Sequence, residues 1–247
     1  MISSPHRLIE RRRMVRWLML GLSAVTLVPS LRLIAAERGE AEIKGLRLPI
    51  FTTEGRLIRR LNIESGSGGM TAGTLLRGHI EFFAADSGTE PVAWMKFEDA
   101  RYEWSQQVVT GSEIVRFELK AGARLSGRGY VYENRENRLI LRSEVTGDFE
   151  GTHLAAPEAR IIFDPAQRVA EDIIEEILFE RTVTVSGMAA EKLGMERVRA
   201  AKAHYRAETG KLHLTAPIHL IDKQGVEHPA EAEVMEMRLR PAKDSRP

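Results

Sequence analysis

The chain has 247 residues, of which 43% are hydrophobic and 29% are charged, and it contains no cysteine. This length and balance indicate a globular protein with one large domain or two modest ones, and they exclude collagen-like, proline-rich and low-complexity chains. The lack of cysteine in this chain excludes disulfides, thiolate metal ligands, a cysteine nucleophile and an acylated-cysteine anchor.

The net charge of +1 conceals an uneven distribution of charge along the chain. Residues 1–36 hold six arginines and one glutamate, whereas the other residues hold 30 basic and 34 acidic side chains. A mildly acidic body repels phosphate backbones, so we expect no nucleic-acid partner. The basic end instead predicts a targeting segment.

An uncharged stretch from Trp17 to Leu31 follows the arginines, which predicts export with the amino terminus left in the cytoplasm. As a signal peptide, the segment would be cleaved after Ala36. As a retained anchor, the segment would extend to Ala36, with the charged end of Arg32 reaching back towards the membrane surface. It would then have roughly the 20 residues that a spanning helix needs. Both alternatives place the rest of the chain outside the cytoplasm.

From Leu46 onward the chain reads as short segments in which apolar and polar residues alternate, the pattern of an antiparallel β protein. The clearest pair is 127–132 and 139–145, joined by a turn in which Asn134 and Asn137 suit left-handed geometry. Ser65–Gly69 is expected to be a flexible loop. Further strands are predicted within 55–63, 79–84, 93–104 and 114–121.

One segment carries a helical pattern instead. Asp164 and Pro165 suit the start of a helix, and the apolar residues that follow recur at helical spacing. We therefore expect one amphipathic helix near 165–179, which closes an end of the sheet core or docks a partner.

A hairpin repeats with a shift of 73 residues. Superimposing Tyr132 on Tyr205 also aligns Leu139 with Leu212 and Leu141 with Leu214. A fainter copy ends at Tyr102. Such a hairpin cannot bury its apolar face alone, so copies must stack or wrap on one another.

Strong catalytic or metal-binding signatures are not found in the sequence, so no enzyme activity, cofactor or metal is expected. The histidines are scattered. Acidic residues such as Glu175 and Glu176 keep open a carbohydrate-active enzyme, which would need two carboxylates at a defined separation across a cleft.

Apolar residues fall on one face of each predicted strand. They either fill a core or line an open channel for acyl chains. The candidates are Ile80, Phe82, Met95, Phe97, Val115, Phe117, Leu119, Leu139, Leu141, Leu212 and Leu214.

These motifs resemble a known family. The amino-terminal export segment, Phe51-Thr-Thr-Glu-Gly55, Asp99-Ala-Arg-Tyr102 and the hairpin containing Tyr132 are similar to LptC, the membrane-tethered periplasmic component of lipopolysaccharide export. The repeat at 203–214 resembles that of the soluble relative LptA and the OstA-like domain. The resemblance covers most of residues 46–221.

The resemblance implies an antiparallel β-jellyroll, or curved β-sandwich of stacked hairpins, whose interior carries lipopolysaccharide. It also implies an uncleaved anchor in the inner membrane, and as partners the lipopolysaccharide ABC transporter and a periplasmic LptA-like bridge protein joined edge to edge. We therefore expect an anchor or signal at 1–36, a jellyroll at 46–150, a connector with the helix at 151–181, an OstA-like repeat at 182–240 and a disordered tail at 241–247. A structural envelope protein without a ligand is the alternative.

Overall fold

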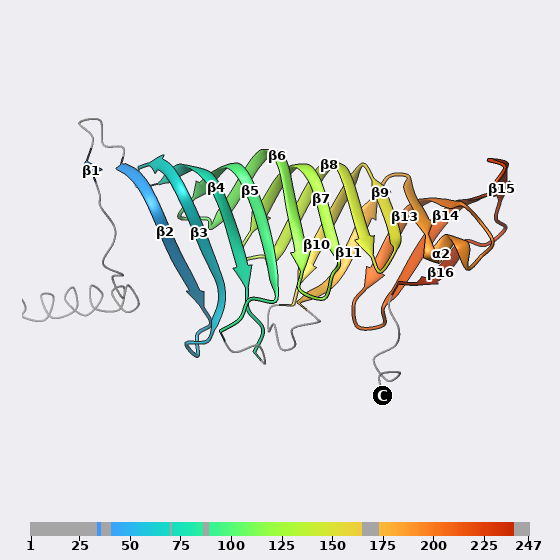
Figure 1. Ribbon diagram of the computed structural model, residues 1–247, viewed down its shortest axis with the longest axis horizontal. Helices are drawn as coiled ribbons and strands as arrows, with labels where there is room; N and C mark the ends of the chain where they lie inside the picture. Colours follow the sequence, from blue (N-terminus) through green and yellow to red (C-terminus); the bar gives the residue numbers. More distant parts are fainter. Residues whose placement is uncertain (1–33, 36–40, 70, 86–88, 165–172, 240–247) are drawn as a thin grey trace, which may run out of the picture. The chain divides into compact units, whose positions relative to one another are not determined.

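The computed structural model describes residues 34–35, 41–69, 71–85, 89–164 and 173–239 (Figure 1). The chain divides into two compact units, 1–31 and 32–247, and every described residue lies in the second. The described strands form one sheet in which every pairing is antiparallel, which confirms the expected β architecture. In chain order they are β1 (Ile34–Ala35), β2 (Ala41–Phe51), β3 (Leu57–Gly68), β4 (Ala72–Phe82), β5 (Ala93–Glu103), β6 (Val108–Leu119), β7 (Arg124–Glu133), β8 (Arg138–Phe149), β9 (Thr152–Ala156), β10 (Glu158–Phe163), β11 (Ile174–Glu180), β12 (Val183–Gly187), α2 (Met188–Glu191), β13 (Arg197–Arg206), β14 (Lys211–Ile221), β15 (Glu227–Pro229) and β16 (Val234–Arg238).

The sheet is a single up-and-down meander. Each strand from β2 to β8 pairs with the next strand in the chain. Beyond β8 some strands are broken in two: the first half of β8 pairs with β10 and its second half with β9, while β14 pairs with β16 and β15 in the same way. Two consecutive short strands therefore take the place of one long strand.

Each long strand changes direction near its middle. The ladder registers shift between Lys96 and Arg101 in β5, between Gly111 and Ile114 in β6, and between Ser126 and Arg128 in β7. Such bulges bend a strand and increase its twist. Figure 1 shows the strands folding over, so that one half of each lies in front of the other half.

The two sets of strand halves form two facing walls. We call the halves that end at the β2–β3, β4–β5 and β6–β7 loops the first wall, and those that end at the β3–β4, β5–β6 and β7–β8 loops the second wall. Alternate residues of both walls point into one shared core, for example Phe82 of β4 and Tyr132 of β7, which are each buried. The outward residues are polar or charged in most positions.

The predicted hairpin and its repeat are confirmed. β7 and β8 pair Tyr132 with Leu139, and β13 and β14 pair Tyr205 with Leu212. The same shift of 73 residues therefore holds in the sequence and in the register. In the turn, Asn137 has a φ of 50°, as expected, whereas Asn134 does not adopt the left-handed conformation.

The amphipathic helix expected near 165–179 is wrong over its described part, because Ile174–Glu180 is strand β11. Ile162 pairs with Glu176 and Phe163 with Ile174, so Glu175 is an extra residue in a β-bulge. A bulge inserts one residue into the alternation, and the resulting spacing of apolar residues resembles that of a helix. Residues 165–172 lie outside the described residues.

A second correction concerns Ser65–Gly69, since residues 65–68 belong to β3 and pair with β4. Glycine permits this pairing at close range, because a Cβ on Gly68 would lie 2.6 Å from Cα of Gly73. A run of serine and glycine carries no apolar alternation, so the sequence pattern missed the strand.

The expected connector and repeat add to the same sheet. Residues 151–181 supply β9, β10 and β11, and the strands from β12 to β16 extend the meander. Of the predicted anchor or signal at 1–36, the structure describes only Ile34–Ala35, which form β1. The rest of that segment and the tail at 241–247 lie outside the described residues. Within the described ranges, none of the helices combines the length and apolar character needed to cross a membrane.

The bend in β6 and β7 yields a stability prediction. A Cβ on Gly111 would lie 2.4 Å from Cε1 of Tyr130, whose side chain is buried. We expect Gly111→Ala to lower the free energy of unfolding by about 1–3 kcal/mol, the usual cost of overpacking. Urea denaturation measures this, with exposed Ser112→Ala as the control; equal midpoints for the two variants would contradict it.

Candidate functional site

The apolar interior brings together all eleven residues singled out from the sequence. Each has an exposed fraction of 7% or less, and all belong to the same hydrophobic core. The sequence therefore identified the inward face of its strands correctly. That these side chains contact lipid stays a prediction.

Four aromatic rings connect the two walls in the amino-terminal part of the interior. Phe82 and Phe117 come from the first wall, and Tyr132 comes from the second. Phe163 belongs to β10, which pairs with the second-wall half of β8 and so extends that wall. Ring centroids of Phe82 lie 5.6 Å from Phe117, 6.1 Å from Tyr132 and 5.0 Å from Phe163. Aromatic pairs at these distances add stabilisation beyond their buried area.

A buried arginine closes the same region. Arg59 of the first wall is 1% exposed, and its Nη1 donates hydrogen bonds to Oδ1 of Asn134 at 2.6 Å and to the Asn134 carbonyl oxygen at 3.1 Å. Its Nη2 donates to Oδ1 of Asn137 at 2.5 Å. We call Arg59, Asn134 and Asn137 the clasp, because they join β3 to the β7–β8 turn across the two walls.

Aromatic faces hold the clasp from within the core. The guanidinium carbon of Arg59 lies 5.7 Å from the ring centroid of Phe82 and 5.8 Å from that of Tyr132, distances at which cation–π attraction acts. The hydroxyl of Tyr132 donates to Oδ1 of Asn134 at 3.2 Å. Burial raises the pKa of Tyr132 to about 12, against a smaller lowering by the Arg59 charge.

The sequence pattern does not reveal the clasp, because it predicts only turn positions for Asn134 and Asn137. A signal was nevertheless present, because Arg59 shares its strand parity with Leu61 and Ile63, which are buried. Strict alternation therefore places an arginine on an inward face. The turn asparagines supply the oxygens that make its burial tolerable.

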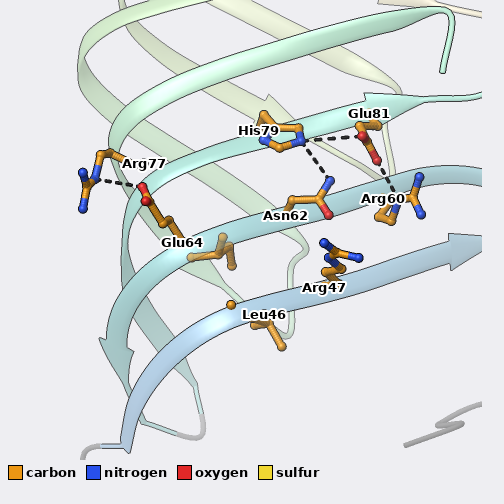
Figure 2. Close-up of a pocket in the computed structure, with 10 residues that line it drawn as sticks. Leu46, Arg47, Arg60, Asn62, Glu64, Arg77, His79 and Glu81 are labelled. Carbon is orange, nitrogen blue, oxygen red and sulfur yellow. Dashed lines mark hydrogen bonds and ion pairs between the residues drawn. The ribbon is translucent and has the colours of Figure 1, made fainter. Parts of the chain in front are cut away.

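A polar hollow of about 540 Å³ lies outside the first wall, over β2, β3 and β4 (Figure 2). Nε of Arg60 lies 2.6 Å from Oε2 of Glu81, and Nε of Arg77 lies 2.9 Å from Oε2 of Glu64. His79 stands between these pairs, with Nε2 3.6 Å from Oε1 of Glu81. The hollow therefore contains two arginines already neutralised by carboxylates.

The carboxyl group of Glu81 in this hollow has a perturbed pKa. Burial acts to raise its pKa, but hydrogen bonds from Arg60 and Asn62 and the Arg60 charge outweigh burial, so the pKa is lowered below its ordinary 4.5. The folded state thus favours the charged carboxylate.

The open ends of the meander are two sheet edges. Among the described strands, β2 at the amino-terminal end pairs with β3 on one side, and on its other side only Ala41 and Glu42 pair with β1. At the carboxyl-terminal end, the short strands β15 and β16 pair with no described strand other than β14. Unpaired edges present backbone donors and acceptors to a partner strand.

Glu175 and Glu176, the acids that a carbohydrate-active enzyme could use, line an open hollow of about 390 Å³. Asp164, Arg206 and Glu208 line it as well. Oε2 of Glu176 lies 2.7 Å from Nε2 of His204, so this carboxylate already has a partner. Within the described part of the chain, no group of three histidine, aspartate or glutamate side chains is placed to hold a metal.

Comparison with known proteins adds no family. No protein-family model matches the chain, and no curated protein matches it. The interior, the clasp, the outer hollow and the free edges are therefore interpreted from their own residues.

We expect the clasp to be a main stabiliser of the two facing walls. Arg59→Ala removes three hydrogen bonds from a charged donor, two of them to the buried Asn134, so the free energy of unfolding should fall by about 2–3 kcal/mol. Urea denaturation measures the loss. Arg116→Ala, at an exposed position of the same wall, is the matched control and should shift stability by less than about 0.5 kcal/mol. Similar losses for both variants would contradict the clasp.

Glu81 should make stability depend on pH. Because its folded pKa is lowered, its contribution is complete at neutral pH and is lost as pH falls below about 4.5 through the folded value. We expect Glu81→Gln to reduce stability at neutral pH and to flatten the acid decline, measured as urea midpoints from roughly pH 3 to pH 7. Glu98→Gln, at an exposed position, should keep the wild-type slope.

Proposed function

We propose that the protein is a non-enzymatic component of lipopolysaccharide transport across the cell envelope. In this function it receives lipopolysaccharide at the inner membrane and passes it along the apolar interior towards the outer membrane. The observation that carries the proposal is one continuous apolar interior enclosed by the bent strands of a meander, with a sheet edge at each end.

Three further features support this proposal. The basic, then uncharged, amino-terminal segment is typical of export, and as a retained anchor it would tether the chain to the inner membrane. The free edges suit edge-to-edge association with the transporter and with a bridge protein. The resemblance of the repeated hairpin to LptC and LptA points to the same task.

A structural envelope protein without a ligand is the second candidate. It is favoured by the complete burial of the interior, where Phe82, Leu139 and Leu212 are each 0% exposed. For lipid to enter, the walls must separate and these side chains must exchange their mutual contacts for contacts with acyl chains. Transport and scaffolding therefore differ in whether the interior opens in the cell.

Photo-crosslinking in cells separates the two candidates. A photoreactive amino acid at Phe97 or Leu141 points into the interior, and we expect an adduct with lipopolysaccharide that is detected by blotting. The same probe at Lys96 or Arg142, the exposed neighbours on the same strands, should give none.

Each result has a definite reading. Adducts confined to the inward positions support transport. No adduct at Phe97 or Leu141 in a folded, exported protein overturns the proposal and favours the scaffold. Equal adducts at inward and outward positions indicate membrane proximity rather than an interior site, and they also overturn it.

A further inference from the structure

The free edge of β2 offers a partner strand both unpaired backbone groups and side chains that could select the partner. From Ile43 to Phe51 this strand pairs with β3, and no described strand pairs with its other side. The edge spans both walls, because β2 crosses the bend at Gly45, whose φ is 61°. A partner strand therefore has a long template on which to add.

The inward side of β2 is only partly covered. Leu46 is 8% exposed, but the inward residues nearer the β2–β3 loop, Leu48 and Ile50, are only half-buried. By contrast, Leu61 and Ile63 on the next strand are 2% and 3% exposed. The apolar core thus continues to the edge and lacks its last layer there. A strand that completes this layer must carry apolar side chains on its inward face.

The outward side of β2 carries a charge that has no counterpart in the described chain. Arg47 is exposed and makes no ion pair with any described residue, while its neighbours Arg60 and Arg77 are neutralised by Glu81 and Glu64. Figure 2 shows Arg47 on β2, beside the hollow and at the outermost strand of this wall.

The register explains why Arg47 remains unneutralised. Its Cα partner on β3 is Asn62, and the partners that follow on β4 and β5 are His79 and Lys96. This row of outward side chains holds no carboxylate from β2 to β5. Only a strand added beyond β2 can place an acidic side chain directly opposite Arg47, where cross-strand charges of opposite sign attract.

We propose that the β2 edge docks a strand of a different protein that alternates apolar inward residues with an acidic residue opposite Arg47. This inference rests on the proposed function, since it specifies the chemistry of one of the edge partners. The apolar residues complete the layer at Leu48 and Ile50, and the acidic residue sets the register of the pair.

A second copy of this chain fits the edge poorly. In the register that continues both walls, its last strands would follow β2 in the antiparallel sense. Successive Cα partners across the sheet show which residue of the second copy would lie opposite each free residue of β2. The row of Arg47 leads to Pro229, which offers neither a charge nor an N–H group.

Two strand peptides test the inference on the full-length protein in detergent micelles. Each has roughly nine residues, which matches the free stretch of β2, and alternates valine with threonine. N-methylation along one edge prevents the peptides from pairing with themselves. They differ only in the central outward residue, which is glutamate in one and lysine in the other, and fluorescence anisotropy gives their affinities.

We expect the glutamate peptide to bind about fivefold more tightly than the lysine peptide, the scale of a cross-strand charge pair. Arg47→Glu should reverse this preference. Arg116→Glu, an exposed arginine of the same wall on β6, should leave it unchanged. Reversal by the charge swap is a result that general loss of folding does not produce.

Other outcomes overturn the inference. Equal binding of the two peptides, an unchanged preference in Arg47→Glu, or binding of neither peptide excludes an acid-selective edge. Concentration-dependent association of the wild-type protein in sedimentation experiments identifies a second copy as the occupant instead. Lipid crosslinking at Phe97 is scored separately, so failure of the edge and failure of lipid transport remain distinguishable.

Discussion

The fold depends on one constraint: an apolar face on a hairpin must be covered by something. Each long strand satisfies it by bending near its middle, so that its two halves face each other across a shared interior. Phe82 on one wall then packs against Tyr132 and Phe163 on the other, at ring-centroid distances of 6.1 and 5.0 Å. A flat sheet of the same strands would leave these rings in water, at a cost proportional to their apolar area.

The bend needs backbone conformations that a regular ladder cannot supply. Bulges in β5, β6 and β7 fall at neighbouring positions, so successive strands turn together and the walls stay in contact. Gly111 belongs to this design, because only a residue without Cβ leaves room for the ring of Tyr130. The repeated hairpin of β13 and β14 also contains a bulge, between Ala200 and Lys202.

Two arginines then affect how strongly the two walls are held together and which partner strand can pair with the sheet edge. The clasp around Arg59 fixes the two walls from inside, in surroundings where a guanidinium with fewer partners would be costly. At the β2 edge, by contrast, Arg47 is exposed to solvent and is available to pair with an acidic side chain of a partner strand. An arginine thus stabilises the fold where it is buried, at Arg59, and can recognise a partner where it is exposed, at Arg47.

The sequence by itself determined the antiparallel β class, the hairpin containing Tyr132 and its repeat, and the inward positions such as Phe97 and Leu141. These follow from local alternation, which every strand obeys whatever its neighbours are. Only the tertiary structure decided that Glu175 is a bulge residue rather than part of a helix, that Asn134 binds Arg59, and that Arg47 lies on a free edge. Those features depend on pairings between residues far apart in the chain, and alternation within one strand carries no record of which strand lies next to it.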